Sequence, residues 1–288
     1  MKRPETVARW KDRARPGEHG FSLIELMIAA AVLVIVLGGA VQYITVATQR
    51  SKVEQTKVDL SQEGREFVDE FERDIHQAGY PSCFMFNNAA ACAAANPNTA
   101  AMGLVLVSNT QIVFEGDVDG DGVVDSVSYQ VVDSAGNSPP TGTCPCTIQR
   151  SQVPKGTAAN FSLELQNVVN SGAPTAAQIA GGQLYGNGLP IAGNVLFGGG
   201  TITNTAYYAA VTSFKDFPVF SAYDQNGASL PLVPALTYPT NATTLATIKT
   251  IRLTINLLGS GASGYDPKTG VRPVVTLVGY GRVNNDKT

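Results

Sequence analysis

An apolar run near the N-terminus constrains this chain more than any other feature of its sequence. Across residues 21–48 the only charged side chain is Glu25, and residues 21–41 are largely apolar. A helix of this length reaches roughly 30 Å at 1.5 Å per residue, which is about the thickness of the hydrocarbon core of a bilayer. We therefore expect residues 21–41 to form a transmembrane half-helix.

Basic side chains precede this run. Residues 1–20 carry a net charge of +3, which leaves −6 for the remainder of a chain whose total is −3. Positive charge favours a cytoplasmic N-terminus, so the part after the helix is expected outside the cytoplasm. Because affinity for nucleic acid comes largely from clustered Lys and Arg, the acidic remainder argues against direct nucleic-acid binding.

The junction between the basic and the apolar stretch reads GFSLIELMIA over residues 20–29. It resembles the processing site of type IV prepilins and type II secretion pseudopilins, which a membrane-embedded peptidase cuts after the glycine and then N-methylates. The resemblance implies cleavage between Gly20 and Phe21, methylation of Phe21, and a mature chain that keeps its apolar helix. The alternative is an ordinary secretory signal cut after Ala40, which would discard that helix.

Glu25 lies inside the apolar run. A carboxylate in hydrocarbon costs about 2.5–3.5 kcal/mol, and such residues usually mark a function and have a partner. The resemblance implies that Glu25 pairs with the new amine of Phe21 on a neighbouring subunit and sets the axial register during assembly. The alternative is a carboxylate near the cytoplasmic interface that snorkels or stays protonated.

Apolar residues continue at helical spacing beyond residue 41. They recur every seven residues and then extend along the same face: Val46, Val53, Leu60, Phe67, Phe71, Ile75 and Ala78. Charged residues alternate over residues 50–66, as on an exposed helix face. One helix is therefore expected from Phe21 to about Ala78, with residues 42–79 as its amphipathic half, and Gly79 followed by Pro81 predicts where it stops.

Residues 80–288 are expected to form a β-rich head. Short runs typical of strands lie at residues 104–107, 111–115, 123–132, 207–211, 248–258 and 274–280. A long helix with an antiparallel sheet predicts an α+β fold. Residues 166–214 contain no charged side chain and are expected to be a long, weakly ordered insertion. The alternative is a neutral, small-residue surface that serves subunit packing. Residues 67–80 and the last two strands resemble PilW-like minor pilins and related larger pseudopilins.

An acidic stretch in the head has the spacing of a calcium loop. Asp117, Asp119, Asp121 and Asp125 form D-x-D-x-D-G-x-x-D, and the carbonyl of Val123 can add an oxygen. Alternate carboxylates on a tight loop suit Ca²⁺, although Ser128 stands where an EF-hand has its bidentate glutamate, so weak affinity is expected. The alternative is a polar hairpin turn, because Asp-Gly pairs also form turns.

The four cysteines are Cys83, Cys92, Cys144 and Cys146. All four belong to the part expected in an oxidising compartment, so disulfides are predicted. Three pairings are open. Pairing of Cys83 with Cys92 closes a plausible loop, whereas a bond between Cys144 and Cys146 would close a small, strained ring.

The head holds no histidine, because His19 is in the leader and His76 is on the helix. Histidine-based catalytic or zinc sites therefore cannot be built within it. We expect a non-enzymatic subunit, a minor pilin that helps to initiate or cap a type IV pilus. Its expected partners are other pilin subunits, the prepilin peptidase and the assembly platform of the inner membrane. A type II secretion pseudopilin and a membrane-anchored adhesin or binding module are the alternatives.

The expected location is a single-pass position in the inner membrane with the head in the periplasm, and later a fibre at or beyond the cell surface. The expected organisation has a leader at residues 1–20, the two helix halves at 21–41 and 42–79, and the head at 80–288. Calcium is the only cofactor predicted.

Overall fold

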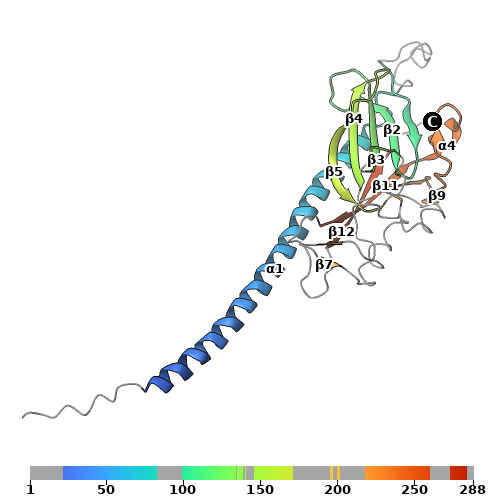
Figure 1. Cartoon of the computed structure of the whole chain (residues 1–288). Coiled ribbons are helices and arrows are strands. Elements are labelled where there is room, and N and C mark those ends of the chain that lie inside the picture. Colours follow the sequence, from blue (N-terminus) through green and yellow to red (C-terminus); the bar gives the residue numbers. More distant parts are fainter. Residues whose placement is uncertain are drawn as a thin grey trace, which may run out of the picture. The chain divides into compact units, whose positions relative to one another are not determined.

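The structure is a computed structural model of the whole chain (Figure 1). It describes residues 22–82, 99–133, 135–138, 140, 146–170, 195–196, 200–201, 218–259 and 273–283. The chain divides into two units, Met1–Ala47 and Thr48–Thr288. The domain boundaries expected from the sequence stay predictions.

A single long helix, α1 (Leu23–His76), belongs to both units. It begins directly after Ser22 and ends within two residues of the expected Ala78, so the prediction of one uninterrupted helix is confirmed. After it, Gly79 adopts a φ of 86° and its N–H donates to the carbonyl of Glu115 at 2.8 Å. A glycine suits this left-handed position because it has no Cβ, and here it turns the chain toward the sheet.

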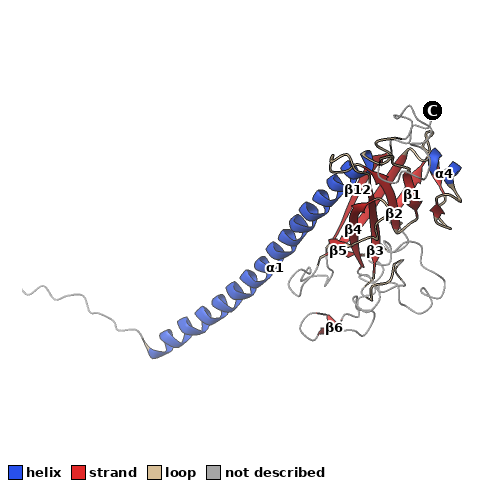
Figure 2. Cartoon of the chain, turned by 90° about the horizontal axis from the view of Figure 1, so that it is seen from above, coloured by secondary structure: helices blue, strands red, loops and turns tan. Residues whose placement is uncertain are grey.

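Ten strands form one antiparallel sheet in the second unit (Figure 2). The path runs β10-β1-β2-β3-β4-β5-β11-β8-β9, and β12 pairs with β11. The bounds are β1 (Gly103–Val107), β2 (Gln111–Gly116), β3 (Asp125–Val132), β4 (Cys146–Pro154), β5 (Ser162–Val168), β8 (Phe220–Tyr223), β9 (Ser229–Leu230), β10 (Leu236–Thr237), β11 (Thr250–Leu258) and β12 (Val274–Arg282). The α+β fold is thereby confirmed.

The remaining elements are short. A separate pair consists of β6 (Val195–Leu196) and β7 (Gly200–Thr201), and α4 (Ala242–Thr247) follows β10. The strand expected at 207–211 lies outside the described residues, as does most of the neutral insertion at 166–214. Strands β4 to β10 and helix α4 were not predicted.

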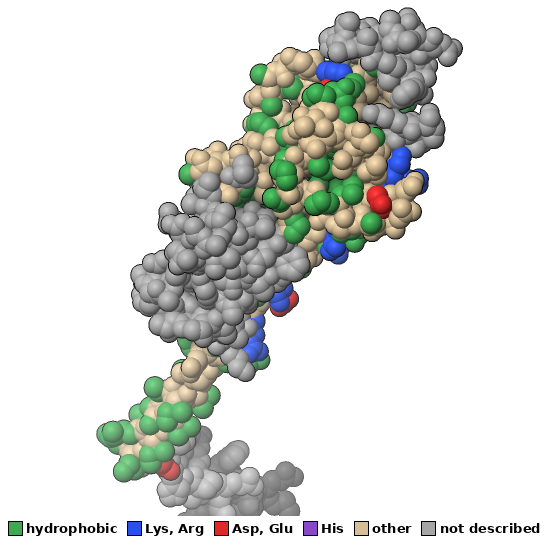
Figure 3. All heavy atoms as spheres, turned by 90° about the vertical axis from the view of Figure 1, so that its right-hand side faces the viewer, with side chains coloured by type: hydrophobic (Ala, Val, Ile, Leu, Met, Phe, Trp, Pro, Cys, Tyr) green, Lys and Arg blue, Asp and Glu red, His purple; other side chains and the backbone are tan. Residues whose placement is uncertain are grey.

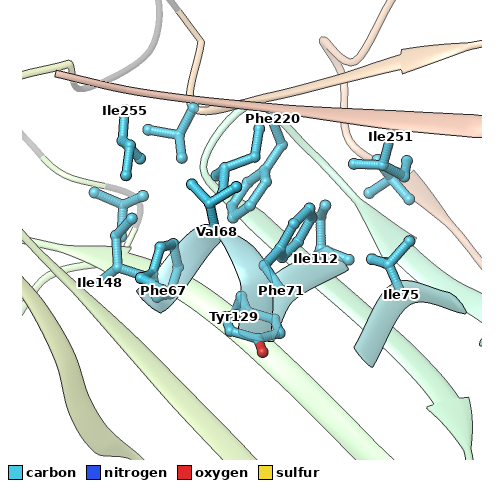
Figure 4. Packing of buried hydrophobic residues seen from close by; sticks show 14 of the residues in the cluster. Phe67, Val68, Phe71, Ile75, Ile112, Tyr129, Ile148, Phe220, Ile251 and Ile255 are labelled. Carbon is cyan, nitrogen blue, oxygen red and sulfur yellow. The ribbon is translucent and has the colours of Figure 1, made fainter. Parts of the chain in front are cut away.

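The core lies between the sheet and the part of α1 in the second unit (Figure 4). Phe71 and Ile75 are fully buried, and Phe67 is 4% exposed. The rings of Phe67 and Phe71 make T-shaped contacts with the ring of Tyr129 from β3, at centroid distances of 5.9 and 5.4 Å. Val53 is also buried, so the predicted apolar seam is confirmed from that residue onward.

Strand β12 approaches α1 closely because two of its residues are glycines. A Cβ at Gly279 would lie 2.6 Å from Val68 Cγ1, and one at Gly281 would overlap Ile75. Between these glycines, the backbone N–H of Tyr280 donates to Glu72 Oε1 at 2.8 Å. The helix is thus held on β12 by backbone contact as well as by side-chain packing.

Candidate functional site

The N-terminal part of α1 is apolar and exposed. Every residue from 22 to 47 is exposed, and Leu23, Ile24 and Leu26 keep 65% or more of their surface. The most apolar 18-residue window has a mean hydropathy of 2.6, and by length and composition the helix can cross a membrane. Such a surface is stable only against lipid or other apolar surfaces.

Glu25 lies in the first turn of this apolar segment. Its Oε2 accepts the backbone N–H of Ser22 at 3.1 Å, and Ser22 directly precedes the helix. This is the glutamate half of a capping box, and a negative charge there also favours the positive end of the helix dipole. Gly20 and Phe21 lie outside the described residues, so cleavage between them and the pairing of Glu25 with an amine stay predictions.

The acidic loop joins β2 to β3. Asp117, Asp119 and Asp121 each offer a carboxylate oxygen within 4.8 Å of the others. The loop fixes Asp117 from within, because the N–H groups of Gly120 and Gly122 donate to its two oxygens at 2.8 and 3.1 Å. Three converging carboxylates form the kind of oxygen cluster that a hard cation prefers.

Asp125 does not belong to that cluster. It is 6% exposed, begins β3, and accepts a bond from Gln152 Nε2 at 2.7 Å through Oδ2. Burial raises the pKa of its carboxyl; the bond from Gln152 opposes this rise, and the nearby carboxylates of the loop add to it. Ser128 lies further inside the strand, opposite Val113 and Ser151.

The loop is therefore a hairpin connection that brings three of the four predicted aspartates together. The N–H of Val123 donates to Asp121 Oδ1 at 2.7 Å, which braces the loop from its C-terminal side. Calcium binding stays a prediction.

A comparison with protein families gives one match. Residues 15–41 fit the model described as "Prokaryotic N-terminal methylation motif". This match supports a type IV pilin-like protein. It spans the end of the basic stretch, the predicted cleavage junction and the membrane-length segment. Searches of curated proteins and of solved structures give no match.

The motif supports the interpretation of the chain as a pilin-like protein, without specifying the class of pilin. It supports a membrane-anchored pilin or pseudopilin that interacts with other subunits and with a prepilin peptidase. It covers none of the head, so it does not support the narrower resemblance to PilW-like minor pilins. Proteins with this motif are structural subunits, which agrees with the expected non-enzymatic function.

One of the four cysteines lies among the described residues. Cys146 opens β4, is fully buried and is disulfide-bonded. Cys83, Cys92 and Cys144 lie outside the described residues, so the connectivity of the disulfides stays a prediction.

A buried ionic network that was not predicted from the sequence joins α1 to the sheet. Asp74 is fully buried, and its Oδ2 accepts the hydroxyl of Tyr129 at 2.6 Å. The same oxygen accepts Arg150 Nη2 at 2.7 Å and Nε at 2.9 Å. One carboxylate oxygen thus connects the helix to β3 and β4.

The electrostatics of the network follow from its burial. Burial and the charge of Asp74 both raise the pKa of Tyr129, so its hydroxyl remains a donor. Burial lowers the pKa of Arg150, but Tyr129 and Asp74 outweigh it and raise the value overall. Burial also raises the pKa of Glu70, which lies 3.5 Å from Arg150 Nε, and that guanidinium opposes the rise.

The sequence does carry a signal for this network. Asp74 falls three residues after Phe71 and one before Ile75, on the apolar face of the helix. A carboxylate at such a position is rarely buried without a partner, so a cation from the sheet was to be expected.

Proposed function

We propose that this chain is a minor pilin, a structural subunit that helps to initiate or cap a type IV pilus. The observation that carries the proposal is the exposed apolar segment of α1, most of which lies within the matched N-methylation motif and which contains a single carboxylate. In the membrane this segment is solvated by lipid. In a fibre it packs against the same segments of other subunits, with the head in the periplasm or beyond.

Glu25 has two roles to separate, because it caps the helix and would also supply the charge that pairs with the amine of a neighbouring Phe21. Glu25→Gln keeps a side-chain acceptor for the N–H of Ser22 but removes the charge, since glutamine also serves in a capping box. Glu25→Ala removes both. If charge pairing drives assembly, both variants stay in the membrane and are lost from sheared fibres.

The matched control is Glu54→Gln, which also neutralises an exposed carboxylate of α1 and loosens only the surface pair with Lys57. This variant is expected to enter fibres like the wild type. If Glu25→Gln assembles normally while Glu25→Ala fails, Glu25 acts as a cap and the pairing is refuted. Normal assembly of both variants would refute any role for Glu25 in the fibre.

A type II secretion pseudopilin is the second candidate, because the same motif serves both classes of subunit. A membrane-anchored adhesin or binding module is the third. Deletion of the gene separates them: loss of twitching supports the pilin, and loss of protein export with normal twitching supports the pseudopilin. Normal fibres that no longer attach to their target would support the adhesin.

We also propose that the loop of Asp117, Asp119 and Asp121 binds Ca²⁺. The support is the convergence of their oxygens within 4.8 Å. Without a bidentate glutamate, a Kd of about 10⁻⁴–10⁻³ M is expected. Calorimetry on the chain in detergent should detect this binding, and Asp119→Asn should abolish it. Asp224→Asn, in another turn, is the matched control. Absence of heat at millimolar calcium would refute the proposal.

A further inference from the structure

A cavity of about 380 Å³ lies on the head, away from both the acidic loop and the buried network. Its volume falls within the range of roughly 300–1,000 Å³ that is common for small-molecule sites. It is lined by Tyr223, Asp224, Gln225, Gly227, Thr250 and Tyr280. Figure 3 shows the head from the side of α4 and β9, where charged side chains are few among the described residues.

The floor and walls of the cavity come from three neighbouring strands. Thr250 of β11 pairs with Tyr223 of β8, and Tyr280 lies on β12, opposite Arg252. Two strand spacings separate β8 from β12, and Tyr280 also lies two residues further along the strands than Tyr223, so the backbones of the two tyrosines are roughly 12 Å apart. The small side chain of Thr250 leaves the space between them open.

The rim of the cavity is a rigid turn between β8 and β9. Asp224 Oδ1 accepts the N–H groups of Asn226 and Ala228, both at 2.8 Å. Gly227 adopts a φ of 77° and its N–H donates to the carbonyl of Asp224 at 3.1 Å. Within the described part of the chain no hydrogen bond reaches Asp224 Oδ2, so this oxygen is held in place and available.

Arg252 braces the opposite wall. Its guanidinium carbon lies 5.9 Å from the centroid of the Tyr280 ring. The ring itself is 54% exposed, and its backbone N–H is fixed by Glu72. A preformed site of this kind loses little conformational entropy when a ligand binds.

We propose that this cavity binds a neutral saccharide unit. The hydroxyls of a sugar need both donors and acceptors, which Asp224, Gln225 and Thr250 supply. The apolar C–H face of a sugar ring packs on aromatic rings, which the two tyrosines supply. Among the described residues that line the cavity, Asp224 is the one charged side chain, and its negative charge disfavours phosphorylated or carboxylated ligands. None of these described lining residues is aliphatic, which disfavours a purely apolar ligand.

The test is saturation-transfer NMR on the full chain in a detergent without a sugar head group. Cellobiose and chitobiose are the neutral probes, and digalacturonate is the acidic one. Binding of a neutral disaccharide is expected. Tyr280→Ala and Gln225→Ala are each expected to weaken it, by about tenfold for the loss of the stacking ring. Tyr238→Ala removes another exposed tyrosine outside the cavity and should leave the affinity unchanged.

The proposal is refuted if no neutral disaccharide binds at roughly 10 mM. It is also refuted if Tyr280→Ala and Gln225→Ala, each with an unchanged near-UV spectrum, bind as tightly as the wild type. Binding of digalacturonate alone would refute the assignment to a neutral sugar. These outcomes do not depend on whether the chain enters a fibre.

Discussion

Removing the carboxylate of Asp74 should destabilise the head more than any surface change on α1. In Asp74→Ala the hydroxyl of Tyr129 and two nitrogens of Arg150 lose their common acceptor. The side chain of Arg150 is only 14% exposed, so water cannot fully replace that partner. The variant therefore leaves a largely buried cation without its closest counter-ion.

The magnitude follows from the geometry. Breaking a buried ion pair by removing one partner costs about 3–5 kcal/mol. The contact of Arg150 with Glu70 is longer, at 3.5 Å, and the side chain of Glu70 is 30% exposed, so it compensates little. For a unit of this size each kcal/mol lowers Tm by about 2–4 °C, so a fall of about 6–20 °C is expected.

The assay is thermal unfolding in detergent, followed by the near-UV circular dichroism of the tyrosines. Asp69→Ala is the control, since Asp69 is exposed on the same helix and its loss should change stability by less than about 0.5 kcal/mol. The double variant Asp74→Ala with Arg150→Met removes both charges, and it should be more stable than Asp74→Ala alone. A double variant less stable than that single variant would refute the reasoning.

Three further predictions concern the head. Because the pKa of Tyr129 is raised, its contribution to the free energy of unfolding is complete below about pH 10 and declines as the pH rises further. Tyr129→Phe should remove that decline. At neutral pH the same variant should lower the free energy of unfolding, measured by urea denaturation, by about 1.5–3 kcal/mol. Because the pKa of Asp125 is raised, the ionised form of this carboxyl destabilises the fold. In calcium-free buffer, Asp125→Asn should therefore raise Tm at neutral pH. This gain should vanish below about pH 3.8, where Asp125 is protonated in the folded and the unfolded chain alike. Gly281→Ala should lower the free energy of unfolding by about 1–3 kcal/mol, since the new Cβ would overlap Ile75. The double variant Gly281→Ala with Ile75→Ala should lose less than the sum of the losses in the two single variants.

Local sequence patterns predicted most of the fold near the helix. The apolar spacing from Val53 to Ile75 marks the buried face of α1, and Gly79 marks its end within three residues. The strands at β1, β2, β3, β11 and β12 were predicted to within two residues or so, because each carries several β-branched side chains between turn residues. The order and register in which these strands pair could not be predicted from the sequence, because they depend on contacts between distant segments.

Other features escaped prediction for identifiable reasons. Strand β4 has the sequence CTIQRSQVP, whose many polar residues obscure the alternation of apolar and polar side chains that is typical of a strand. Asp125 has the spacing of a loop ligand, and in the structure it begins β3 and accepts a bond from Gln152, which the sequence did not indicate. The bonds from Asp74 to Tyr129 and Arg150 join residues 55 and 76 positions apart, which no local pattern shows. The capping box has a local sequence signature, a serine followed three residues later by a glutamate, which Ser22 and Glu25 carry.

We propose that the apolar segment stays on the mature protein as an anchor and assembly surface. Intact-mass and N-terminal peptide mass spectrometry of the chain purified from membranes can test this proposal. We expect a first residue Phe21 that carries an N-methyl group. A mature chain that begins at Val41 would have lost the apolar segment and would overturn the proposal.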